Sequence, residues 1–68
     1  MVNVKLLRDT IKESGMTTVA VCRKSGILKQ TLYNRYKRPQ SFTMEEVDAL
    51  KDVLQLSERQ YQKIFFAR

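Results

Sequence analysis

The sequence has few of the residues that stabilise or activate very small proteins through covalent or metal chemistry. Its 68 residues include one cysteine, Cys22, and no histidine. A single thiol excludes an internal disulfide, and without imidazoles there are too few ligands for a structural zinc site. Histidine is the commonest general base in enzymes, so its absence also removes that catalytic group. The sequence has no glycine-rich loop for binding phosphate either. We therefore expect no enzyme, metal or cofactor, and a fold stabilised by apolar packing and helix caps.

Signals for membranes and secretion are missing too. No apolar run approaches the roughly 20 residues that a membrane-spanning helix needs. Lys5 and Arg8 interrupt the apolar N-terminus, which is not typical of a signal peptide. A free thiol fits a reducing compartment. These absences predict a cytoplasmic protein without a membrane partner.

Acidic residues are absent from the middle of the chain. The interval between Glu13 and Glu45 holds six basic residues, namely Arg23, Lys24, Lys29, Arg35, Lys37 and Arg38. The other seven basic residues equal the seven acidic ones, so the net charge of +6 resides in this interval. An unbalanced basic segment favours a polyanionic partner. The alternative is an ordinary solvated face.

Apolar periodicity predicts an all-α fold in one domain, residues 1–68, because no stretch alternates with period two for long. We expect five helices, at about 4–14, 17–25, 28–37 and two within about 43–66. Expected N-caps are Asn3 and Thr17, and expected capping boxes begin at Thr43 and Ser57. Gly15 and Gly26 are expected to end the first two helices. Leu28 occupies the cap position of the third helix and cannot cap, which costs about 1 kcal/mol.

The spacing of apolar residues also predicts the core. The inward stripes are Val4, Leu7 and Ile11; Val21 and Cys22; Leu32 and Tyr36; Val47, Leu50 and Leu54; and Ile64 and Phe65. We interpret Cys22 as a small core residue, because no base lies near it in the sequence. Phe66 can lie either in the core or in a dimer interface. The same two alternatives apply to Tyr61, which is also expected to pack on Leu56 as a hydrophobic staple.

The segment 17–38, TTVAVCRKSGILKQTLYNRYKR, resembles the helix-turn-helix of the Cro and phage-repressor (XRE-like) type. The residues that carry the resemblance are Thr17, Thr18, Cys22, Gly26, Ile27 and Leu32. PQSFTMEEVDALKDVLQLS resembles the fourth helix of that fold, and QKIFFAR resembles the end of small regulators from phages and prophages of Gram-positive bacteria. The likeness covers about Val4 to Phe66. It implies a five-helix DNA-binding domain acting in a bacterial host cell.

The third helix carries the residues that would read DNA. In the resemblance, positions 29, 30 and 34 are the usual base readers, here Lys29, Gln30 and Asn34. Gln30 and Asn34 can each pair bidentately with adenine, and Lys29 can donate to guanine. Tyr33 shares their face and can touch a thymine methyl group or reach a phosphate. The alternative is that all four are ordinary polar surface residues.

Phosphate contacts are expected around that face. Thr18 begins the second helix, matches a backbone-gripping position of the family, and lies where the helix dipole favours an anion. The residues that follow the third helix can contact the other strand of the DNA, namely Lys37, Arg38 and Ser41. Arg35 either reaches a phosphate or is solvated. Arg23 and Lys24 have structural and DNA-binding roles as equal alternatives.

These residues predict a sequence-specific transcriptional regulator that occupies a double-stranded DNA operator. One domain reads only about half a turn, so a homodimer on a two-fold site is expected. A second hypothesis is an antirepressor-like module that binds and modulates a partner repressor without reading DNA. The uncapped third helix and the apolar C-terminus, which includes Phe65 and Phe66, motivate this alternative.

Overall fold

A computed structural model describes residues 1–67 and confirms the all-α class; this part of the chain contains no strand. The elements are α1 (Val4–Glu13), α2 (Thr18–Ser25), α3 (Lys29–Lys37), the 3₁₀ turn η1 (Pro39–Ser41), α4 (Met44–Val53) and α5 (Glu58–Phe65). The turn η1 was not predicted; it begins at Pro39, which stops α3 but fits the first position of a new turn. No helix among residues 1–67 has both the length and the hydropathy of a membrane span.

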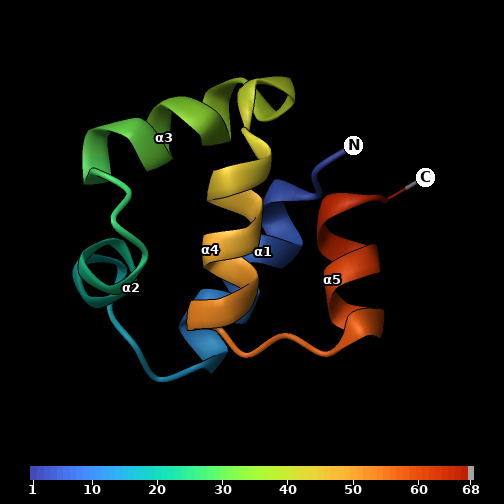
Figure 1. The fold of residues 1–68 in the computed structure, drawn as a ribbon, viewed down its shortest axis with the longest axis horizontal. Coiled ribbons are helices and arrows are strands. Elements are labelled where there is room, and N and C mark those ends of the chain that lie inside the picture. The colour runs from blue at the N-terminus through green and yellow to red at the C-terminus, as the bar shows by residue number, and fades with distance from the viewer. Residues whose placement is uncertain (68) are drawn as a thin grey trace.

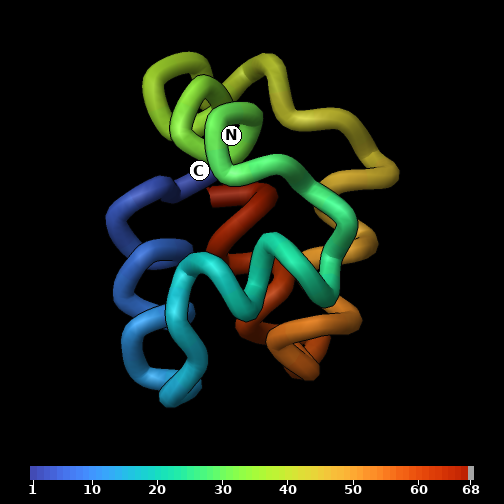
Figure 2. Tube along the Cα trace, turned by 90° about the vertical axis from the view of Figure 1, so that its left-hand side faces the viewer, coloured from blue at the N-terminus to red at the C-terminus, as the bar shows by residue number. Residues whose placement is uncertain are grey.

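The helices surround α4, which stands in the middle with α2 on one side and α5 on the other (Figure 1). In the same view α1 passes behind α4, and α3 lies across the upper end. Figure 2 views the molecule from the α2 side and shows α3 end-on above α2. The helix pair α2 and α3 therefore occupies one side and one end of the molecule, and most residues of α3 are exposed.

Each helix contributes one fully buried side chain to the centre of the core. These residues are Leu7, Val21, Leu32, Leu50 and Ile64, and none is more than 1% exposed. The predicted stripes are confirmed for Ile11, Cys22, Val47 and Phe65, which are also buried, whereas Val4, Tyr36 and Leu54 are only partly buried. Burial raises the pKa of the Cys22 thiol, which keeps it protonated, as expected for a core residue.

Local capping chemistry sets the helix ends where the sequence predicted them. Asn3 Oδ1 accepts the Leu6 N–H at 3.0 Å, and Thr17 Oγ1 accepts the Ala20 N–H at 3.0 Å. Reciprocal capping boxes join Thr43 with Glu46 and Ser57 with Gln60. Gly26 ends α2 with φ of 77°, a left-handed conformation that a side chain would disfavour. α3 begins without any side-chain cap, because Leu28 offers no acceptor.

The two ends of the described chain are hydrogen-bonded to each other. The Ala67 N–H donates to the Met1 carbonyl at 3.0 Å, and the Asn3 N–H donates to the Ile64 carbonyl at 2.6 Å. These bonds fasten the segment before α1 to the end of α5, and Figure 1 shows that segment beside the end of α5. The start of α1 is thus fixed to the end of α5 by backbone hydrogen bonds.

The uncapped start of α3 gives a first prediction. Leu28 is 72% exposed, so replacing it removes little burial, while a serine can accept the orphan N–H of Gln30 or Thr31. Leu28→Ser should stabilise the protein by about 1 kcal/mol. For a domain of this size, that is a rise in melting temperature of roughly 4–8 °C. Thermal unfolding followed by circular dichroism measures it.

Met44→Ser is the matched control for that measurement. Met44 is 59% exposed and begins α4, but Thr43 already caps that helix. The control removes an exposed apolar side chain without adding a cap, and we expect little change. Equal rises in both variants would show that loss of an exposed apolar group, and not capping of α3, is responsible.

Candidate nucleic-acid interface

The four predicted base readers lie on one outward face of α3. Lys29, Gln30, Tyr33 and Asn34 are all exposed, while Leu32 on the opposite side is completely buried. The Gln30 side-chain amide donates from Nε2 to Asn34 Oδ1 at 3.3 Å. The structure therefore brings the readers together and links two of them. Their DNA contacts remain a prediction.

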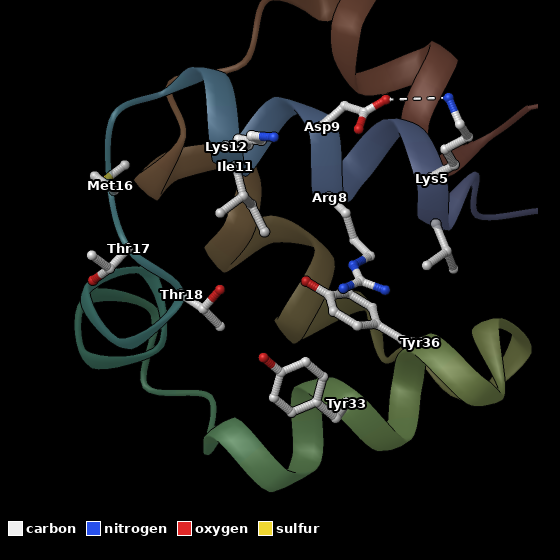
Figure 3. A pocket seen from close by; sticks show the side chains of 11 residues that line it. Lys5, Arg8, Asp9, Ile11, Lys12, Met16, Thr17, Thr18, Tyr33 and Tyr36 are labelled. Atoms are coloured by element: carbon white, nitrogen blue, oxygen red, sulfur yellow. Dashed lines mark ion pairs between the residues drawn. The ribbon is translucent and has the colours of Figure 1, made fainter.

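Tyr33 marks the edge of this face. Its ring is 38% exposed and packs edge-on against Tyr36, with the ring centroids 5.6 Å apart. Lys29 Nζ lies 5.9 Å from the Tyr33 ring centroid. The Tyr33 hydroxyl points toward α1 and the start of α2 (Figure 3). We call the outward face formed by Lys29, Gln30, Tyr33 and Asn34 the reader face. Tyr33 therefore lies between the reader face and the space that separates α3 from α1.

Arg35 is bound within the chain, an arrangement that was not among the alternatives of a phosphate contact or solvation; its phosphate contact stays a prediction. Its Nε and Nη2 donate to Glu46 Oε1 and Oε2 at 2.8 and 3.1 Å. Arg35 lies on the side of α3 that faces the beginning of α4, which brings its guanidinium to this carboxylate. Glu46 Oε1 also accepts the Thr43 N–H at 3.0 Å, so the pair joins α3 to the capping box of α4.

The electrostatics of Glu46 follow from those contacts. The hydrogen bonds from Arg35 lower the pKa of the Glu46 carboxyl, burial opposes this, and the Thr43 N–H lowers it further. The hydrogen bond to Glu46 likewise raises the pKa of Arg35. Both groups are charged at neutral pH, and their side chains are 26% and 15% exposed. The pair therefore restrains the rotation of α3 about its own axis.

Tyr36 is the second predicted anchor, and the structure places it half-buried against the core. The Arg8 guanidinium on α1 lies 5.3 Å from the centroid of its ring, a cation–π contact. Burial raises the pKa of Tyr36 to about 12, although the nearby Arg8 charge acts in the opposite direction. α3 is thus fixed at three places: by Leu32, by Arg35 and by Tyr36.

The remaining phosphate candidates lie at the start of α2, at the end of α3 and in η1. Thr18 is the first residue of α2, and its hydroxyl is not needed as a cap because Thr17 performs that role. Lys37 and Arg38 are exposed at the end of α3. Ser41 in η1 donates its hydroxyl to the Arg38 carbonyl at 2.6 Å, so this hydroxyl already has a partner in the chain.

Most basic residues of the acid-free interval form no ion pair among residues 1–67. The ion pairs found among residues 1–67 are Lys5–Asp9, Arg35–Glu46 and Lys51–Glu58. Five cations of the acid-free interval belong to none of them, namely Arg23, Lys24, Lys29, Lys37 and Arg38. Arg23 and Lys24 are exposed in the last turn of α2, where the helix dipole also favours a cation.

The two candidates for a dimer interface differ. Tyr61 is only 9% exposed and lies in the core, where Lys51 Nζ is 4.3 Å from its ring centroid. Of the two alternatives for Tyr61, the structure therefore favours the core, because the single chain already covers its side chain. Phe66 is 43% exposed, with its ring centroid 5.4 Å from that of Tyr61. Of these two candidates, Phe66 is the one that keeps an exposed surface.

Two contributors to the site were not assigned from the sequence. Glu46 was expected only as part of a capping box, and Arg8 was placed in the charge-balanced flank. Both act on α3 across long stretches of chain, which no local pattern reveals. For Glu46 one signal was available: it follows the acid-free interval closely and could therefore have been the counter-charge of one cation.

No group of three or more histidine, cysteine or acidic residues that could hold a metal ion occurs in residues 1–67. Comparison with family models, curated proteins and solved structures finds no match to this chain. Inferences about its function therefore depend on the residues of the interface.

The ion pair between α3 and α4 predicts a pH dependence of stability. Because the pKa of Glu46 is lower in the folded chain than its ordinary value of 4.5, the pair stabilises the fold above that value. The contribution is lost as the pH falls through the lowered folded pKa. Glu46→Gln should therefore reduce the free energy of unfolding at neutral pH, and the difference from wild type should vanish in acid. Urea unfolding across this pH range measures it.

Glu45→Gln is the matched control. Glu45 is the neighbouring residue in the first turn of α4, is exposed, and belongs to none of the ion pairs found in the described chain. Glutamine at position 46 can still accept the Thr43 N–H, so the comparison isolates the charge. Identical pH profiles for the two variants would contradict a stabilising role of the Arg35–Glu46 pair.

Proposed function

We propose that this protein is a sequence-specific DNA-binding transcriptional regulator, Cro-like or repressor-like, that inserts α3 into the major groove. The observation that carries the proposal is the outward face of α3. It presents Lys29, Gln30 and Asn34 to solvent, while Leu32, Arg35 and Tyr36 fix the helix from other sides. The major groove admits one α-helix and displays a distinct pattern of donors and acceptors for each base pair.

The linked amides of Gln30 and Asn34 suit an adenine. In their mutual hydrogen bond Gln30 uses its amide nitrogen and Asn34 its oxygen. The Gln30 oxygen and the Asn34 nitrogen remain for an external partner, one acceptor and one donor. Adenine presents the N6 donor and the N7 acceptor in the major groove. Lys29, one position before Gln30, can donate to a neighbouring guanine.

Basic residues without an ion-pair partner in the described chain lie next to the reader face. Lys37 and Arg38 follow it at the end of α3, and Thr18 lies at the start of α2. Contacts of this kind to phosphates position a helix in its groove without reading sequence. With five cations of the segment outside the intramolecular ion pairs, binding should weaken steeply as salt is added.

Regulation would follow from occupancy of an operator, which excludes polymerase or a rival regulator. One α3 reads about half a turn of DNA, so tight binding calls for two copies on a two-fold site. Phe66 offers an exposed aromatic surface for such a dimer. The setting we propose is the cytoplasm of a bacterial host cell.

A second candidate is a module that binds and modulates a partner repressor. A groove of about 530 Å³ runs between the α2–α3 turn and the start of α4, with Leu28 in its lining. Leu28 is the most exposed large apolar residue after Met1. An exposed apolar side chain at the turn between α2 and α3 suits contact with a partner protein as well as with the major groove of DNA.

Selection of bound sequences from a random DNA pool tests the proposed function. We expect an enriched motif with two-fold symmetry. On that motif, Gln30→Ala and Asn34→Ala should each cost about 1–3 kcal/mol of binding free energy and relax the preference at one position. Gln62→Ala, an exposed glutamine on α5, is the control and should bind like wild type.

The results separate the two candidates. An enriched motif that both α3 variants bind with wild-type affinity would contradict this assignment of readers. Absence of any DNA binding at low salt, together with co-elution with a repressor, would favour the interaction module. In that case Leu28→Ser should weaken the protein complex, since the apolar side chain would be its contact.

A further inference from the structure

Three helices enclose a cleft of about 660 Å³ that borders the reader face of α3 (Figure 3). Its lining includes Arg8 from α1, Thr18 from α2, and Tyr33 and Tyr36 from α3. Figure 3 shows the hydroxyl groups of Thr18, Tyr33 and Tyr36 directed into the space between the helices. The cleft therefore gathers hydrogen-bond donors from two elements beside a cation from a third.

Arg8 is held in place without being neutralised. Its guanidinium lies over the Tyr36 ring at 5.3 Å, and it takes part in none of the ion pairs found among residues 1–67. A guanidinium placed over a ring face keeps its N–H donors available at its edges. Such a side chain is positioned for an anion in advance and retains its full charge.

The hydroxyl groups are suited to the same ligand. Because burial raises the pKa of Tyr36 to about 12, the phenol stays protonated and can donate. Tyr33 is held edge-on to Tyr36, which fixes the direction of its own hydroxyl. The Thr18 hydroxyl is not used to cap α2, since Thr17 does so. All three groups can donate to a phosphate oxygen.

One acidic residue, Asp9, also lines the cleft. Its carboxylate lies 3.6 Å from Lys5 Nζ. Figure 3 shows this pair on the side of α1 away from the tyrosines. The acid is thus partly compensated and directed away from the donors, so it does not cancel the charge of Arg8.

The geometry points to a binding site for a DNA backbone phosphate in this cleft, with Arg8 as the cation and the hydroxyls of Thr18, Tyr33 and Tyr36 as donors. This inference rests on the proposed function. Lys29 of the reader face contacts the Tyr33 ring, so the cleft and the base-reading residues share an edge. A duplex whose bases meet Gln30 and Asn34 would bring a phosphate of the flanking backbone to this edge. The interface then extends from the helix-turn-helix onto α1.

Binding to a random-sequence duplex at several salt concentrations tests the site, because phosphate contacts do not depend on sequence. Arg8→Gln should lower the affinity about tenfold at low salt and reduce the slope of log affinity against log salt by about 0.9. Arg59→Gln removes one exposed cation from α5 that does not line the cleft, and it should change the affinity less than about twofold because no direct phosphate contact is lost. Arg8→Lys keeps the charge and should restore the slope.

Tyr33→Phe provides a test that does not alter charge or ring packing. It should lower the affinity by about two- to tenfold and leave the salt slope unchanged. Thermal unfolding of each variant identifies any that lose the fold; if Arg8→Gln does, Tyr33→Phe and Arg8→Lys decide the matter. Equal losses for Arg8→Gln and Arg59→Gln, or wild-type affinity for Tyr33→Phe, would overturn the site while leaving DNA binding intact. No binding by the wild type would overturn the proposed function itself, and the phosphate site with it.

Discussion

The ion pair between Arg35 and Glu46 determines how the protein can present α3. This helix has only nine residues and no side-chain cap, so it would be marginal in isolation. Only Leu32 is completely buried along it. One buried side chain fixes a helix against its neighbours but permits rotation about its own axis. The bidentate contact with Glu46 restricts that rotation, because a planar guanidinium matches a carboxylate in one orientation.

The Arg35–Glu46 pair also allows the basic segment to meet two requirements that conflict with each other. A helix that reads DNA has to leave polar and positive groups without partners in the free protein, whereas a small domain needs contacts to stay folded. Here the contacts are made on one side by Leu32, Arg35 and Tyr36, and the outward face keeps Lys29 and Gln30 free of acids. Glu46 supports this division because it serves α4 as a cap and α3 as a counter-ion at once.

The limits of sequence reasoning follow from the range of each interaction. Helix ends were predictable to within a residue or two, because caps such as Thr43 with Glu46 act over three positions of the chain. The buried stripes were predictable from helical periodicity. The partner of Arg35 was not, since it lies eleven residues away in a different helix. The choice between core and interface stayed open for Tyr61 for a related reason: whether a small domain covers an aromatic ring depends on how α4 and α5 pack, which no local pattern specifies.

Arg8 shows that the balance of charge along the sequence differs from the balance of charge on the folded surface. Along the sequence it belongs to a flank where acids and bases cancel, yet the nearest acid in the chain, Asp9, is paired with Lys5. A line of contacts runs from Lys29 over Tyr33 and Tyr36 to Arg8, with a cation at each end. The two packed rings lie between these cations, neither of which belongs to an ion pair found among residues 1–67. On the proposed function, the cations available to a polyanion therefore come from α1 as well as α3 and are not confined to the acid-free interval of the sequence.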